Sequence, residues 1–149
     1  YTFAVGSIDP QVAKLLQVTK EALYQGVAQA KAGNRVGDIS AAVQQHAEAN
    51  GFSVVRELVG HGLGREMHED PEVPNYGARG RGPLLKEGMV ICIEPMVNMG
   101  RRQVVFEEDG WTVRTADRKP SAHFEFAVAI RKEGADVLTD FGIIEQAIS

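Results

Sequence analysis

Three ionisable side chains stand in stretches of sequence that are otherwise apolar or rich in glycine. His61 lies between glycines, Glu94 ends the apolar run 89–94, and Glu125 interrupts the apolar run 122–128. A carboxylate on a buried strand is costly unless it is paired, protonated or bound to a metal. Imidazole and carboxylate groups are also common ligands of divalent transition metals. The three residues together therefore predict a cation site.

Glu94 is placed by the alternation of side chains along its strand. It shares one strand face with Val90 and Cys92, and it is followed by Pro95, which lacks the N–H needed for regular pairing. A carboxylate at a strand end beside such an interruption is positioned to point into a cleft. The alternative is a strand-end glutamate whose side chain simply reaches water.

Glu125 shares its strand face with His123, Ala127 and Ala129. The small alanine side chains leave room beside the carboxylate, as a binding site requires. His123 is a candidate for a residue that orients a metal ligand. The alternative is an antiparallel strand with one solvated face, although this face holds few polar groups.

The glycine-rich segment contributes two histidines. Gly60, Gly62 and Gly64 allow the backbone to approach its neighbours closely and to adopt positive φ around His61. His68 follows seven residues later and is a candidate ligand, or a hydrogen-bond donor that stabilises charge developing on a substrate. The alternatives are a flexible loop with an incidental His61 and a surface position for His68.

Two other residues are interpreted more simply. Trp111 follows the turn Asp109-Gly110 and is a candidate wall of an apolar pocket, with plain hairpin packing as the alternative. His46 lies on a predicted helix and is interpreted as structural.

Composition excludes several classes of protein. The chain has 149 residues, enough for one domain with a sizeable core, and its net charge of −4 gives no support for binding nucleic acid or a membrane surface. Cys92 is the only cysteine, which excludes a disulfide framework and favours a reducing compartment. No apolar run approaches the roughly 18 residues of a membrane-spanning helix.

Apolar periodicity predicts an α+β fold, with helices first and an antiparallel sheet later. Asp9-Pro10 is a good helix start, and that helix is expected to end by Gly33. The region 60–88 is rich in glycine, proline and charge, so a long functional loop is expected there. The other predicted elements are a helix at 38–50, strands at 1–6, 52–56, 89–98, 103–107, 111–115 and 122–131, and a short helix at 141–149.

Six short motifs occur in order: Gly60-His61-Gly62-Leu63-Gly64, Met67-His68-Glu69-Asp70-Pro71, Leu85-Lys86-Glu87-Gly88-Met89, Ile93-Glu94-Pro95-Met96, Asp109-Gly110-Trp111 and Ser121-Ala122-His123-Phe124-Glu125. In order and spacing they resemble the type I methionine aminopeptidases, and the resemblance covers nearly the whole chain. It implies the C-terminal half of a pita-bread α+β fold, with two helices packed on a curved antiparallel sheet. Residues 1–149 would be the C-terminal part of a single catalytic domain.

The resemblance implies a two-metal hydrolase that removes the N-terminal methionine from new polypeptides. Its cofactors would be two divalent ions of the Mn, Fe(II), Co or Zn class, held by five side chains. His61, Glu94 and Glu125 would be three of these ligands, with Glu125 bridging the ions. Glu94 would also handle the proton of the attacking water. His68 would contact the scissile amide.

The resemblance also implies a substrate pocket and some departures from the family. Met67 and Trp111 would wall the methionine side chain. The two aspartate ligands of the family precede the matched region, and residues 1–6 resemble the strand just beyond the second of them. The chain alone is therefore expected to bind metal weakly and to lack useful peptidase activity. Phe126 and Ala127 replace a polar residue and a threonine that accompany the second glutamate in the family.

The implied partners are the N-termini of nascent chains in the cytoplasm, with the ribosome as a candidate partner. Nucleic acid and membranes are not expected partners, and the parent protein is expected to be monomeric. A half-fold with an exposed sheet edge can self-associate. The alternatives are a non-catalytic pita-bread module that binds peptides or proteins and a peptidase specific for proline.

Overall fold

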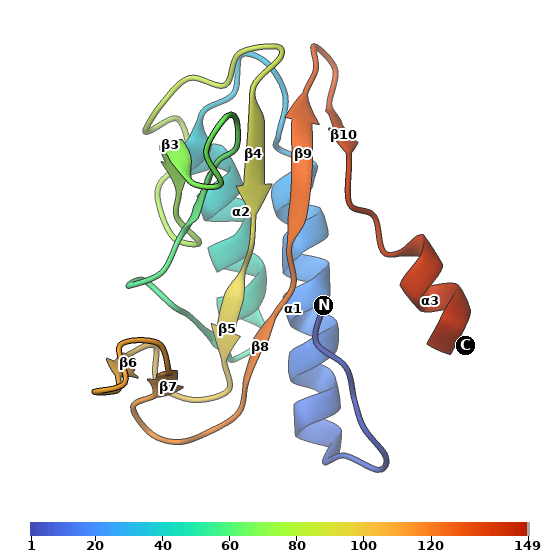
Figure 1. Cartoon of the computed structure of the whole chain (residues 1–149), viewed down its shortest axis with the longest axis vertical. Coiled ribbons are helices and arrows are strands. Elements are labelled where there is room, and N and C mark those ends of the chain that lie inside the picture. The colour runs from blue at the N-terminus through green and yellow to red at the C-terminus, as the bar shows by residue number, and fades with distance from the viewer. Residues whose placement is uncertain (149) are drawn as a thin grey trace.

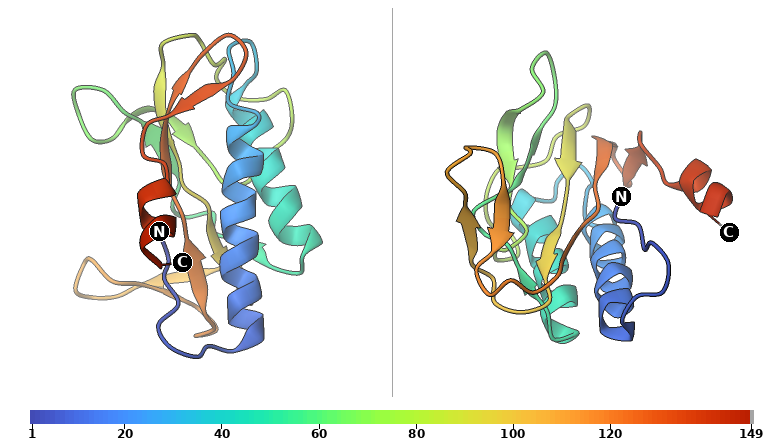
Figure 2. Two further views of the ribbon diagram at one scale, coloured as in Figure 1. Left: turned by 90° about the vertical axis from the view of Figure 1, so that its right-hand side faces the viewer. Right: turned by 60° about the horizontal axis from the view of Figure 1, so that its bottom comes forward.

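Two long helices cover one face of a set of antiparallel strands. The computed structural model describes residues 1–148, and Figure 1 presents helices α1 (Pro10–Val27) and α2 (Val36–Ala49) behind the strands. The view at right angles separates the helical layer from the strand layer (Figure 2). The short helix α3 (Gly142–Ile148) projects to one side. Among the described residues, no helix combines the length and the apolarity needed to cross a membrane.

Helix α1 begins as predicted. The Asp9 carboxylate accepts a hydrogen bond from the Gln11 backbone N–H at 2.7 Å, and Pro10 occupies the first helical position. The helix ends at Val27, earlier than predicted, because the backbone tightens into i→i−3 bonds such as Gln29 N–H to the Gly26 carbonyl at 3.0 Å.

Helix α2 begins at Val36, two residues before the predicted start. Asp38 is the third helical residue, and its side chain bonds back to the backbone N–H of the N-cap residue Arg35. The Asp38 carboxylate accepts hydrogen bonds from the backbone N–H groups of Arg35 at 2.7 Å and Gly80 at 2.9 Å. The second bond also ties the helix to the loop that crosses it.

The two helices and the sheet meet at Gly26. A β-carbon placed there would lie 2.9 Å from Cγ2 of Val43 and 3.3 Å from Cγ2 of both Ile39 and Ile93. The absence of a side chain at this position therefore allows close packing. The buried core consists mainly of Leu15, Leu23, Ile39, Val43, Val54, Val73, Leu85, Ile91, Ile93, Val97, Phe124, Phe126, Val128 and Ile130.

All the strand pairs are antiparallel. A five-stranded sheet has the order β10-β9-β4-β2-β3, a three-stranded sheet the order β1-β5-β8, and β6 and β7 form a separate hairpin. The bounds are β1 Ser53–Val54, β2 Gly60–Gly62, β3 Glu69–Val73, β4 Val90–Ile93, β5 Met96–Asn98, β6 Val104–Phe106, β7 Val113–Thr115, β8 Ser121–His123, β9 Phe126–Ile130 and β10 Ala135–Val137.

Two long strands are interrupted at the same level. In Figure 1, β5 continues the line of β4, and β8 leads into β9 beside it. Ile93 pairs with Phe126 above the interruption, and Met96 pairs with His123 below it. The Phe124 N–H reaches the Pro95 carbonyl across the gap at 3.4 Å, which is long for a backbone hydrogen bond.

Two sequence predictions are corrected here. Residues 1–6 alternate like a strand but form none, because the Thr2 side chain, rather than a backbone ladder, holds the segment to His123. The predicted loop 60–88 contains β2 and β3. Its glycines and prolines hide the period of two that identifies a strand. The hairpin turn at Asp109-Gly110 is confirmed, and so is the short helix predicted at 141–149, which forms α3 over Gly142–Ile148 while residue 149 lies outside the described residues.

Candidate metal centre

The interruption between the paired strands holds both candidate glutamates. Glu94 follows the last residue of β4, and Glu125 lies between β8 and β9. Because Ile93 pairs with Phe126, the segments that carry the two carboxylates face each other. The predicted placement of Glu94 beside a break in pairing is confirmed.

Glu94 lies between two imidazole rings. Its Oε1 is 3.4 Å from Nε2 of His61, and its Oε2 is 3.4 Å from Nε2 of His123. The side chains of His61 and Glu94 are 14% and 13% exposed, whereas that of His123 is 47% exposed. The carboxylate thus lies in a largely enclosed site that opens towards solvent on the side of His123.

The orientation of His61 is set by its own backbone. Its Nδ1 lies 2.9 Å from the Gly62 carbonyl, to which an Nδ1–H group donates. Nε2 is thus the ring nitrogen that faces Glu94 and is available to a cation. A histidine that donates one ring N–H to a backbone carbonyl is in the usual arrangement for a metal ligand.

The glycines on either side of His61 are needed for close approach rather than for positive φ. A β-carbon at Gly60 would lie 2.3 Å from the Cys92 carbonyl oxygen, and one at Gly62 would lie 2.1 Å from the Asp70 carbonyl oxygen. Neither glycine has a positive φ, so that part of the prediction is wrong. Strand β2 lies between β3 and β4 at close backbone distances, and this packing fixes the position of His61.

The donor atoms form two groups that share Glu125. In the first group, one donor atom each from His61, Cys92 and Glu125 lie within 4.8 Å of one another. The second group joins Glu94, His123 and Glu125 within the same limit. Nitrogen, carboxylate oxygen and sulfur donors at this spacing fit a divalent ion of the first transition row. Glu125 is thus common to both groups.

The thiol of Cys92 is part of this electrostatic environment. Burial raises its pKa to about 12, assisted by its hydrogen bond to Glu125 and by the negative charges of Glu125 and Glu94. In the absence of a cation, Cys92 is therefore a neutral thiol beside two carboxylates.

Sequence reasoning missed two residues of this site. Asn75 is 1% exposed, and its side-chain amide donates to the Glu94 carbonyl at 3.3 Å, which helps to fix the end of β4. Cys92 was assigned only to an apolar run, although alternation already placed it on the same face as Glu94. No signal in the loop around Asn75 indicated its burial.

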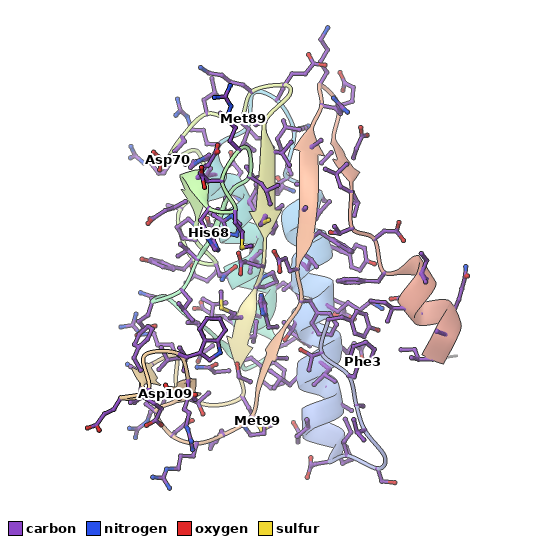
Figure 3. The ribbon with its side chains drawn as sticks, viewed as in Figure 1. Phe3, His68, Asp70, Met89, Met99 and Asp109 are labelled. Atoms are coloured by element: carbon purple, nitrogen blue, oxygen red, sulfur yellow. The ribbon has the colours of Figure 1, made fainter. Side chains whose placement is uncertain are left out.

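The other histidines occupy different environments. The rings of His68 and His61 meet edge to face with centroids 4.3 Å apart, and His68 itself is exposed. Figure 3 presents His68 beside β4, on the side of β3. His46 lies outside the site, where its Nε2 is 2.9 Å from Glu21 of the neighbouring helix, consistent with a structural role.

The two predicted pocket walls are open to solvent. Met67 is 73% exposed and Trp111 is 90% exposed. In Figure 3, Asp109, which begins the turn before Trp111, lies lower in the view than His68, on the β6–β7 hairpin. The roles of Met67 and Trp111 as pocket walls stay predictions.

Residues 1–132 match the family model described as metallopeptidase family M24. The chain belongs to this family. A methionine aminopeptidase from Clostridium perfringens is 56% identical over 138 residues, and methionine aminopeptidase 1 from Bacillus subtilis is 52% identical over 139 residues. These alignments cover 93% of the chain but only 55% and 56% of the two relatives. The predicted resemblance is confirmed, and the chain spans about half the length of these relatives.

The fold of the chain is similar to those of solved aminopeptidase and prolidase structures. A methionine aminopeptidase from Thermotoga maritima superposes with a TM-score of 0.90 at 46% identity, over 93% of this chain and 55% of that one. A prolidase from Pyrococcus furiosus superposes with a TM-score of 0.71 at 26% identity, over 93% and 35% of the two chains. The predicted pita-bread half-fold, with two helices packed on an antiparallel sheet, is confirmed.

Proposed function

We propose that this chain is the C-terminal part of the catalytic domain of a metal-dependent aminopeptidase that removes the N-terminal methionine from nascent polypeptides in the cytoplasm. The observation that carries the proposal is the enclosed Glu94 carboxylate, held between His61 and His123 and beside Glu125. Membership of a metallopeptidase family supports a divalent cation at this position. The similarity to methionine aminopeptidases supports the choice of substrate.

Two ions are proposed rather than one, because Glu125 belongs to both donor groups. Mn, Fe(II), Co and Zn all suit imidazole and carboxylate ligands. Each donor group holds three side chains, fewer than the four ligands of a closed metal site, and the chain spans only about half the length of its relatives, so further ligands are expected from the part that it does not cover. The chain alone should therefore bind divalent ions weakly.

The side chains have separable roles in this proposal. Bound divalent ions supply the Lewis acid that polarises the peptide carbonyl and acidifies water. His61 and Glu125 act as ligands, and Glu94, a further ligand, takes the proton of the attacking water and passes it to the leaving amine. His68, in contact with His61 and open to solvent, donates a hydrogen bond to the oxygen on which charge develops. Met67 and Trp111 are proposed to contact the methionine side chain.

The test combines this chain with a complementary half. The 149-residue chain is mixed, in the presence of Mn²⁺ or Co²⁺, with the N-terminal part of the Clostridium perfringens relative supplied as a separate polypeptide. Release of methionine from a Met-Ala-Ser peptide is expected only when both polypeptides and the metal are present. Glu94→Gln should abolish the release, and His68→Ala should reduce it by about 10² to 10⁴-fold.

Each alternative has its own outcome. Robust turnover by the 149-residue chain alone would contradict the need for further ligands. Cleavage of an Ala-Pro-Ser peptide in preference to Met-Ala-Ser would favour a proline-specific peptidase. Peptide binding without any metal binding would favour a non-catalytic module.

A further inference from the structure

We propose that the sulfur of Cys92 is a direct ligand of one ion at this centre, so that the site favours thiophilic ions such as Zn²⁺ and Co²⁺ over Mn²⁺. The inference rests on the proposed metal centre but does not require peptidase activity. It assigns a donor that neither strand pairing nor the resemblance to methionine aminopeptidases provides.

The geometry supports a sulfur ligand. Cys92 lies on β4 two residues before Glu94, so both side chains project from the same face of the strand. Its Sγ lies within 4.8 Å of donor atoms of His61 and Glu125, and His61 uses Nδ1 for its hydrogen bond to Gly62, which leaves Nε2 as the ring nitrogen available to an ion. Normal metal–ligand distances for these donors are roughly 2.0 to 2.3 Å, so small side-chain movements would allow one ion to contact all three.

The burial of the thiol supports the same role. Cys92 is 2% exposed, so its sulfur reaches neither solvent nor another molecule without opening the sheet. It faces carboxylates rather than the apolar core, which is an unfavourable place for a residue that only packs. On ligation the S–H bond breaks, the sulfur keeps the electron pair that binds the ion, and the proton passes to solvent through the Glu125 carboxylate that accepts the thiol hydrogen bond.

Sulfur changes which ion the site prefers. Mn²⁺ and Mg²⁺ prefer oxygen donors, whereas thiolate, imidazole and carboxylate together suit Zn²⁺ and Co²⁺. A serine at this position would offer only a neutral oxygen. Replacing the sulfur at residue 92 by oxygen should therefore lower the affinity for Zn²⁺ and Co²⁺ relative to that for Mn²⁺, without altering the fold.

The test uses the absorption spectrum of the Co²⁺ complex of the 149-residue chain, recorded without added thiols and without oxygen. A thiolate bound to Co²⁺ gives a near-ultraviolet charge-transfer band in addition to the visible d–d bands. Because the chain has one cysteine, such a band has a single possible source. We expect the band in the unaltered chain and its loss, with the d–d bands kept, in Cys92→Ser and Cys92→Ala.

Calorimetry supplies a second measurement. Cys92→Ser should weaken Zn²⁺ binding by at least about tenfold, while Mn²⁺ binding changes by less than about threefold. His61→Ala should lose both sets of Co²⁺ bands, whereas His46→Gln, which removes a histidine outside the site, should keep them. Circular dichroism establishes that each variant is folded, and an unchanged spectrum on dilution excludes bridging between molecules.

The outcomes separate this inference from the proposed function. Visible d–d bands without a charge-transfer band would overturn the sulfur ligand and leave the metal centre standing. Failure of the 149-residue chain to bind Co²⁺ or Zn²⁺ even at saturating metal would overturn the sulfur ligand, whereas the proposed function is decided by methionine release in the complementation assay. A charge-transfer band together with no methionine release in the complementation assay would support the sulfur ligand and count against the peptidase.

Discussion

At the scale of single residues, the candidate metal centre depends on backbone contacts as much as on its proposed ligands. His61 is held by a hydrogen bond to its neighbour's carbonyl, and the Glu94 carbonyl is held by the buried amide of Asn75. The glycines on either side of His61 allow three backbones to run closer together than side chains would permit. Ligand direction is therefore set by residues that contribute no donor atom.

Gly62→Ala tests this dependence. The added methyl group would meet the Asp70 carbonyl oxygen at 2.1 Å, so β2 and β3 must separate and His61 must turn. We expect Co²⁺ affinity, measured by calorimetry, to fall by about tenfold or more. The control is Gly134→Ala, since nothing lies within 4 Å of a β-carbon there. Equal affinities for the two variants would contradict the role assigned to Gly62.

At the scale of secondary-structure elements, the sequence predicted what local physics determines. The helices follow from apolar spacing and from caps such as Asp9, and the long strands follow from alternation around Glu94 and Glu125. Residues 1–6 could not be predicted, because alternation marks a strand only where a partner is available. Strand β2 was not predicted because Gly60 and Gly62 have no side chains to alternate, and β3 was not predicted because its sequence is mostly charged and contains Pro71.

Asp38 offers a prediction for helix α2. Asp38→Ala removes the acceptor for the Arg35 and Gly80 backbone N–H groups and should lower the free energy of unfolding by about 1 kcal/mol in urea titrations. The control is Asp136→Ala, which breaks an exposed ion pair with Arg131 and should change the free energy of unfolding by less than about 0.5 kcal/mol. Similar losses for both variants would count against the cap.

The cap also predicts a dependence on pH. The hydrogen bond from the Arg35 N–H, followed by that from Gly80, holds the pKa of Asp38 below its ordinary value of 3.8. A folded pKa below the unfolded one means that the ionised cap stabilises the fold above pH 3.8. The contribution disappears as the pH falls through the folded pKa. The stability difference between the unaltered chain and Asp38→Ala should therefore shrink below pH 3.8.

At the scale of the whole molecule, the segments that precede α1 and follow β10 meet at an aromatic cluster next to the candidate metal centre. The ring of Tyr1 lies 4.9 Å from Phe124 and 4.8 Å from Phe141, and Phe141 lies 4.2 Å from Phe126. Phe124 and Phe126 flank Glu125 in the sequence. The segments before α1 and after β10 thus support the strand that carries the shared carboxylate.

Phe141→Ala tests this arrangement against a matched change. Phe141 is 4% exposed, and removing its ring should lower the free energy of unfolding by about 3 to 5 kcal/mol. Phe106, on the β6–β7 hairpin, is 59% exposed, so Phe106→Ala should cost less than about 0.5 kcal/mol. Thermal and urea unfolding provide the measurement, and equal losses would show that the cluster contributes little.

The aligned interruptions in the two long strands also have a consequence for motion. Where both strands lack regular pairing at the same level, the sheet can open locally while the paired segments above and below stay closed. This interruption should therefore open more often than the surrounding sheet. The Phe124 N–H crosses the interruption through a single long hydrogen bond to the Pro95 carbonyl. It should therefore exchange its hydrogen for deuterium faster than the amides of β9. A cation bound by both Glu94 and Glu125 would link the two strands across the interruption. Hydrogen exchange at the Phe124 amide should then slow.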